Sequence, residues 1–280
     1  MKEFVYLRPE TIAEAIQLRL QYGKQAVILN GGTDIVIQLR ERLIAPDYVI
    51  DIKHIDGLNQ ISFDEKEGLT IGCCVTMNQL GGDPIVREKY PYLANAALSV
   101  GSKQVRNRAT CVGNIVNASP LCDTGTPLYV LDAVLCVEGA NGKREIPISE
   151  FITFVRRTTL QPDEIVTAIR VPYLPEAKGI FTKVARRKEV DLSTICATVL
   201  KNGDAYRLAF GAVAPTPIRL PRTEALVSGK ELTEELIDEA AKLARTEVSP
   251  ISDIRASKEY RLDVVEVLVR RSLTQLAKEG

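Results

Sequence analysis

Two glycine-centred loops carry the residues best suited to holding a ligand. In the first loop, "ILNGGTDI", Gly31 and Gly32 directly follow an apolar run. Glycine adopts positive φ without steric cost, so this turn can expose successive backbone N–H groups to an anion. Thr33 and Asp34 add a hydroxyl and a carboxylate at the same turn. The loop is therefore equipped to bind a phosphate group or to orient a sugar hydroxyl.

The second loop, "TCVGNIVNASP", offers similar groups. Thr110, Gly113, Asn114 and Ser119 supply compact hydrogen-bonding groups, and Asp123 supplies a carboxylate further along. Neither loop fits the G-x-G-x-x-G or G-x-x-x-x-G-K-[ST] pattern, so a Rossmann or P-loop site is not supported. A structural turn would explain either glycine loop alone. The two loops together favour a site for one diphosphate.

Histidine and cysteine give little support to acid–base or metal chemistry. The single histidine, His54, follows a strand-like run, and we interpret it as a turn residue. The cysteines lack C-x-x-C spacing and a neighbouring histidine, which favours buried, reduced thiols over a zinc site, a disulfide framework or an iron–sulfur cluster. They are Cys73, Cys74, Cys111, Cys122, Cys136 and Cys196. We expect no catalytic residue and no metal ligand.

The overall composition excludes several classes of partner. The chain has 280 residues, 45% of them apolar, and 36 basic residues balance 36 acidic ones. A neutral chain has no global field to attract nucleic acid or an anionic membrane. It also contains no run of the roughly 20 apolar residues that span a bilayer, and no signal-peptide pattern. We expect a cytoplasmic protein that binds neither nucleic acid nor membrane.

Periodicity and turn residues predict the elements that position the loops. Thr11 and Glu14 form a capping box before a helix that ends at Gly23. Apolar strands at 26–29 and 47–52 flank the first glycine loop. Hairpins are predicted around 64–68 and around Asn141–Gly142, short helices at 77–100, and a strand ending at Pro172. These elements make up the first part of the chain.

The composition changes after the Pro- and Gly-containing stretch 172–179. Strand-like runs follow in "FTKVARR", "STICATVL" and "YRLAFGAV", the last two joined through Asn202 and Gly203. Helical patterns cover 233–245 and the segment from 257 to the end. The second part is therefore predicted to be a small antiparallel sheet that carries helices.

Six ordered blocks carry a family resemblance that spans essentially the whole chain. They are "NGGTDIVIQL", "QVRNRATCVGNIVNASPLCDTGTP", "RRTTLQPDEIV", "FTKVARR" with "DLSTICA", "LAFGAVAPTPIR" and "RASKEYRL". The chain resembles the FAD-binding subunits of bacterial xanthine dehydrogenases and of the wider molybdenum hydroxylase family. The residues of the last three blocks are most similar to those of the purine-oxidising members.

The resemblance implies an α+β fold with two domains. An FAD-binding domain of the vanillyl-alcohol oxidase type would cover 1–175, in subdomains of about 1–55 and 56–175. A C-terminal domain of the CO dehydrogenase flavoprotein type, with a small antiparallel sheet and helices, would cover 176–280.

The resemblance also implies a set of FAD contacts. The first loop would cradle the diphosphate through Val27, Ile28, Leu29, Asn30, Gly31, Gly32, Thr33 and Asp34. The second loop would close over it through Ala109, Thr110, Cys111, Gly113 and Asn114. Asp123 would accept from the ribityl or sugar hydroxyls, and Val166 or its neighbour Ile165 would line the adenine side. Lys183 would lie near the flavin ring, and Leu192 against one of its faces.

Two stretches depart from the family pattern. The family's second loop reads T-x-G-G-N, whereas Val112 replaces one glycine here. Val112 would be strained if this position needs positive φ, and harmless if it only presents an N–H. In "FVRRTT", 154–159, many relatives carry a glycine-rich turn instead, which leaves the role of this segment open.

The function implied by the resemblance is electron exit from a larger enzyme. A molybdenum-cofactor large subunit would oxidise the substrate, a two-cluster iron–sulfur small subunit would relay electrons, and FAD on this chain would pass them to NAD or another acceptor. Two alternatives stay open. One is a stand-alone FAD-dependent oxidase, and the other is a non-enzymatic nucleotide-binding assembly module.

Overall fold

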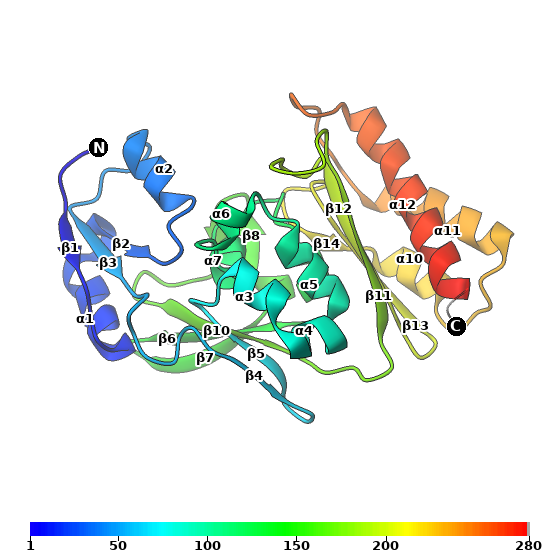
Figure 1. Cartoon of the computed structure of the whole chain (residues 1–280). Helices are drawn as coiled ribbons and strands as arrows, with labels where there is room; N and C mark the ends of the chain where they lie inside the picture. The colour runs from blue at the N-terminus through cyan, green and yellow to red at the C-terminus, as the bar shows by residue number, and fades with distance from the viewer. Residues whose placement is uncertain (279–280) are drawn as a thin grey trace.

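Three β-sheets of three to five strands follow one another in chain order and lie in a row across the molecule (Figure 1). The computed structural model describes residues 1–278. Helices pack around the second and third sheets, so the predicted α+β class is confirmed. The site described below lies where the three parts meet.

The first sheet is parallel and holds the first glycine loop. Its strand order is β1-β3-β2, and helix α2 connects β2 to β3. Thr11 caps α1 by accepting from the Glu14 N–H at 3.1 Å, but the Glu14 carboxylate accepts from Glu10, so the predicted reciprocal box is wrong. The elements are β1 (Val5–Leu7), α1 (Ile12–Tyr22), a 3-10 turn (Gly23–Gln25), β2 (Ala26–Leu29), α2 (Ile35–Arg40) and β3 (Tyr48–Asp51).

The second sheet is antiparallel, with strand order β4-β5-β10-β6-β7. Both predicted hairpins are confirmed, although Gly139 pairs with Gly142, so the second turn is centred on Ala140–Asn141, one position early. The strands are β4 (Ile61–Asp64), β5 (Gly68–Gly72), β6 (Val134–Gly139), β7 (Gly142–Pro147) and β10 (Ile165–Val171).

Short helices connect the two hairpins of this sheet and carry the second glycine loop. Those predicted over 77–100 are confirmed, and more follow where only a polar, glycine-broken stretch was evident. They are α3 (Met77–Gly82), α4 (Pro84–Lys89), α5 (Pro91–Leu98), α6 (Lys103–Arg106), α7 (Cys111–Val116) and α8 (Gly125–Val130). After β7 come α9 (Ile148–Phe151) and a small hairpin of β8 (Ile152–Phe154) and β9 (Arg157–Thr158).

The third sheet and its helices follow the predicted pattern, with β14 and α10 in addition; residues 279–280 of the last predicted helix lie outside the described residues. The sheet is antiparallel in the order β11-β12-β13-β14, and helices α10 to α12 flank it (Figure 1). The elements are β11 (Lys178–Val184), β12 (Ile195–Asn202), β13 (Ala205–Gly211), β14 (Ile218–Arg219), α10 (Pro221–Val227), α11 (Glu234–Glu247) and α12 (Lys258–Lys278).

Two buried apolar clusters stabilise these parts. One cluster joins the first and second sheets and runs from Ala15 to Val171, with Leu200 and Ala209 added from the third sheet. The other lies between the third sheet and its helices. The cysteines are free thiols and all but Cys136 are buried, which agrees with their predicted packing role. Within 1–278 no helix is long and apolar enough to cross a membrane.

Candidate functional site

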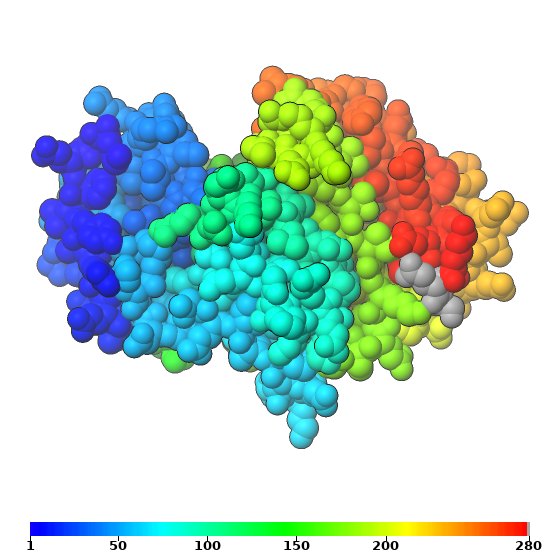
Figure 2. Space-filling model, viewed as in Figure 1, coloured from blue at the N-terminus to red at the C-terminus, as the bar shows by residue number. Residues whose placement is uncertain are grey.

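A large cleft opens where the three sheets meet. Its volume is about 1140 Å³, at the upper end of the roughly 300–1,000 Å³ typical of small-molecule sites. Figure 2 shows the hollow between the N-terminal part, in blue, and the C-terminal part, in yellow-green. The walls come from four segments, within 27–38, 100–123, 156–166 and 183–192, together with Arg19, Ile52 and Arg255.

The first glycine loop forms one wall, and its two glycines have different roles. Gly32 has φ +85°, the positive φ predicted for it. Gly31 does not, which corrects that prediction; a Cβ on Gly31 would lie 2.2 Å from the carbonyl oxygen of Arg108. Gly31 is therefore required because the two loops pass against each other. Among the described residues, the N–H groups of 31–34 have no hydrogen-bond partner.

The second loop presents its N–H groups from the first turn of α7. Thr110 caps this helix by accepting from the Gly113 N–H at 3.0 Å. Val112 is the second residue of the helix and has ordinary helical φ, so it is not strained. Its side chain is buried and its N–H has no partner within the part of the chain described. The departure from the family's glycine is thus accommodated.

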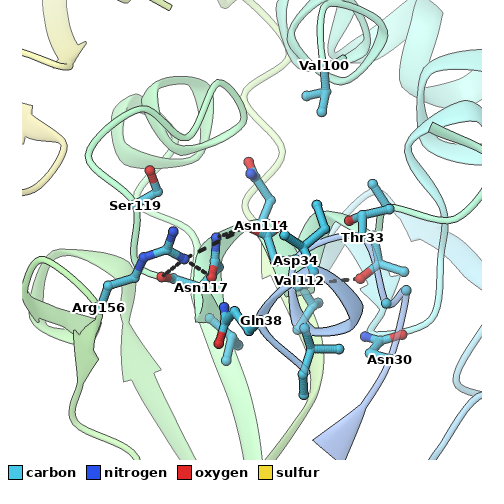
Figure 3. Close-up of a pocket in the computed structure, with 18 of the residues that line it drawn as sticks. Asn30, Thr33, Asp34, Gln38, Val100, Val112, Asn114, Asn117, Ser119 and Arg156 are labelled. Carbon is cyan, nitrogen blue, oxygen red and sulfur yellow. Dashed lines mark hydrogen bonds and ion pairs between the residues drawn. The ribbon is translucent and has the colours of Figure 1, made fainter. Parts of the chain in front are cut away.

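The segment "FVRRTT" forms the β8–β9 hairpin, whose turn contains Arg156. Figure 3 shows the Arg156 side chain reaching toward Asn117, which in turn contacts Asp34. Neither Arg156 nor Asn117 was predicted to belong to the site. The only signal for Arg156 was that this stretch departs from the family pattern.

A buried ion pair lies further along the cleft. Lys183 Nζ is 2.7 Å from Asp123 Oδ2 and donates to the Ser99 carbonyl at 2.9 Å. The Ser193 hydroxyl donates to the other oxygen of Asp123. Burial raises the pKa of Asp123, and the adjacent Lys183 opposes that shift. Both carboxylate oxygens of Asp123 thus already have a protein partner. The sequence had predicted only that Asp123 accepts hydrogen bonds from cofactor hydroxyls.

The predicted site residues converge on this cleft. All of them line it except Leu29 and Cys111; Cys111 is fully buried. Ile165 and Val166 line the cleft together with Gln161 and Pro162. Leu192, which is 51% exposed, lines the cleft from the segment between β11 and β12.

Sequence reasoning missed several lining residues on distant elements. Arg19 of α1 donates to the carbonyl oxygens of Ala26 and Pro162. The second bond links α1 to the segment just before β10 of the second sheet. The partners of Arg19 are backbone carbonyls, one of them 143 positions along the chain, so no local sequence pattern predicts this role. The other missed charged residues are Arg187, Asp191, Glu164 and Arg255.

The residues present fit a bound dinucleotide. Free N–H groups from both loops line one stretch of the cleft, and donors of this kind bind phosphate oxygens. The Oδ1 of Asn30 is buried with no partner among the described residues, which leaves an acceptor for a donor on the ligand. Apolar walls from Val100, Ile165 and Val166 suit the faces of aromatic rings.

Comparison with protein families accounts for nearly the whole chain. Residues 2–174 match the family described as FAD binding domain in molybdopterin dehydrogenase. Residues 180–276 match the family described as CO dehydrogenase flavoprotein C-terminal domain. Since the first match alone covers more than half of the chain, the family is established.

Individual relatives agree with this assignment. The xanthine dehydrogenase FAD-binding subunit of Escherichia coli O157:H7 is 36% identical over 277 residues, covering 96% of this chain and 94% of the relative. The glyceraldehyde dehydrogenase medium chain of Sulfolobus acidocaldarius is 31% identical, covering 98% and 99%. The solved carbon monoxide dehydrogenase of Hydrogenophaga pseudoflava superposes with a TM-score of 0.92 at 32% identity, covering 97% and 96%. The chain therefore belongs to the family of FAD-binding medium subunits of the molybdenum hydroxylases, and its cofactor is FAD.

Proposed function

We propose that FAD lies in the cleft with its diphosphate between the two glycine loops. The observation that carries this proposal is that free N–H groups of 31–34 and of Val112 line the same cleft. Ile165 and Val166 would then line the adenine, and Lys183 and Leu192 would lie beside the flavin ring. The domains would divide near residue 175, which agrees with the gap between the two family matches.

We propose that this chain is the electron-exit subunit of a heteromeric enzyme. Its partners would be a molybdenum-cofactor large subunit and a two-cluster iron–sulfur small subunit, as the membership in the family suggests. When bound, FAD supplies electron acceptance and hydride transfer. The residues of this chain would hold and orient FAD, and the Asp123–Lys183 pair would fix the local charge beside it. No acid–base residue of this chain is needed for that role.

We propose NAD as the acceptor and a purine such as xanthine as the substrate of the large subunit. The E. coli xanthine dehydrogenase subunit is among the relatives, and glyceraldehyde and carbon monoxide dehydrogenases are relatives as well. Arg187 and Arg255 line the cleft on the same part of the chain as Leu192, and their positive charge suits the phosphates of NAD.

An absorption spectrum of the purified chain, recorded with and without added FAD, tests the cofactor site. We expect flavin bands and one FAD per chain, followed by reduction only when both partner subunits and the substrate are added. No flavin under either condition would favour the assembly-module alternative. Reduction by substrate without partners would favour a stand-alone oxidase. Reoxidation by NAD in the assembled enzyme tests the acceptor.

A further inference from the structure

Three side chains connect the two glycine loops across the cleft. Asn117, at the end of α7, donates from Nδ2 to Asp34 Oδ1 at 2.9 Å. Arg156 donates from Nη1 to the side-chain and main-chain oxygens of Asn117, the latter at 3.3 Å. The same Nη1 lies 3.9 Å from Asp34 Oδ1. Figure 3 shows the three side chains pointing toward one another. We name Asp34, Asn117 and Arg156 the latch.

The backbone fixes only one side of this latch. The Arg156 N–H donates to the Ala118 carbonyl at 2.9 Å, so the β8–β9 turn is attached to the end of α7. Arg156 and Asn117 are therefore held together on the same side of the latch. Asp34 belongs to the other, because it follows the first loop and precedes α2. Within the latch, the contacts to Asp34 are the ones that join the two loops.

The backbone of Arg156 argues that this arrangement is constrained. Its φ is +60°, a value that costs a non-glycine residue roughly 1–2 kcal/mol. Such a conformation persists where surrounding structure holds it, and it points to a functional role. Here the turn places the guanidinium against Asn117 and Asp34, although the Arg156 side chain stays 52% exposed.

We infer that the latch retains FAD by holding the two loops together over its diphosphate. This inference rests on the position of FAD proposed above. The latch bonds lie at the ends of the same loops whose free N–H groups line the cleft. Because the cofactor would be held between these loops, it leaves only when they separate, and separation breaks the contacts to Asp34. The latch therefore slows FAD dissociation and has little effect on association.

Arg156→Gln tests this inference in the full-length, FAD-loaded chain. It removes the charge and the fork of donors while Asn117 and Asp34 remain. FAD release after dilution is followed by flavin fluorescence, and association is measured separately by mixing the FAD-free chain with FAD. We expect dissociation to be about 5-fold to 20-fold faster, between the effect of an exposed ion pair and that of a charged hydrogen bond. Association should change less than about 2-fold.

Arg157→Gln is the matched control. Arg157 is the next residue, is exposed, and has no ion pair or side-chain hydrogen bond within 1–278, so its substitution changes the net charge equally. We expect wild-type dissociation for this control. The conservative variant Arg156→Lys keeps the charge but loses the fork, and we expect an intermediate rate.

Two results would overturn the latch. One is equal dissociation rates for Arg156→Gln and Arg157→Gln. The other is slower association with unchanged dissociation, which would mean that Arg156 only attracts the anionic cofactor through its charge. A third variant separates failure of the latch from failure of the FAD position. If Gly31→Ala reduces FAD binding while Arg156→Gln does not, only the latch is wrong; if neither variant changes FAD binding, the position of FAD in the cleft is wrong.

Discussion

The two ends of the cleft are constructed from different parts of the chain. At the glycine-loop end, backbone N–H groups from 31–34 and Val112 face the cleft, and the fit depends on how closely two loops approach. At the ion-pair end, the buried Asp123 and the part-buried Lys183 neutralise each other. Substitutions at the glycine-loop end are therefore expected to act by steric clash. Substitutions at the ion-pair end are expected to act by leaving one charge without its partner.

The difference also explains which departures from the family pattern are tolerated. Val112 can replace a glycine because a residue in the first turn of a helix presents its N–H whatever its side chain. Gly31 cannot be replaced in this way, because its position touches the Arg108 backbone. The structure thus requires glycine at position 31 but not at position 112.

The largest expected effect comes from removing one partner of the ion pair. Lys183→Met leaves the Asp123 carboxylate buried without its counter-charge, which costs about 3–5 kcal/mol of stability. Lys183→Met combined with Asp123→Asn removes both charges and should lose clearly less. Urea unfolding of the FAD-free single and double variants measures both effects. Equal losses in the two variants would show that the pair contributes by packing rather than by charge.

A smaller effect is expected at the glycine-loop end from Gly31→Ala. The added methyl group would lie 2.2 Å from the Arg108 carbonyl oxygen, so the loops must shift. Overpacking of this kind costs about 1–3 kcal/mol, and we expect the chain to lose most of its bound FAD. Thermal unfolding and FAD titration measure the two consequences. Gly82→Ala is the control, because a Cβ there meets nothing within 4 Å. Wild-type FAD affinity in Gly31→Ala would contradict the position of FAD between the two loops.

The smallest effect on FAD is expected from Val112→Gly, which restores the glycine of the family pattern. The N–H that faces the cleft is retained, so FAD affinity should change less than about 2-fold. Stability should fall by at least the roughly 0.5–1 kcal/mol that glycine costs inside a helix. FAD titration together with urea unfolding separates the two quantities. A large gain in affinity would contradict the helical role assigned to this position.

The sequence alone determined most of the local elements and the two glycine loops of the cleft. Apolar periodicity, caps and turn residues act within a few positions, so strands such as β2 and β3, both hairpins of the second sheet and the C-terminal helices were predicted correctly. The two glycine loops were also identified, because glycine after a buried strand is a local signal. The family resemblance added the identity of the ligand and fewer than half of the residues that line the cleft.

Tertiary structure alone decided which of these residues meet. Asp123 and Lys183 are 60 positions apart, and Asp34 and Asn117 are 83 positions apart, yet each pair lies within hydrogen-bonding distance. The constraint on Gly31 likewise comes from a carbonyl in the other loop. Such contacts depend on how whole sheets and helices pack, which no local pattern encodes. The chain thus specifies its loops locally, and the packing of its three sheets brings them together as a site.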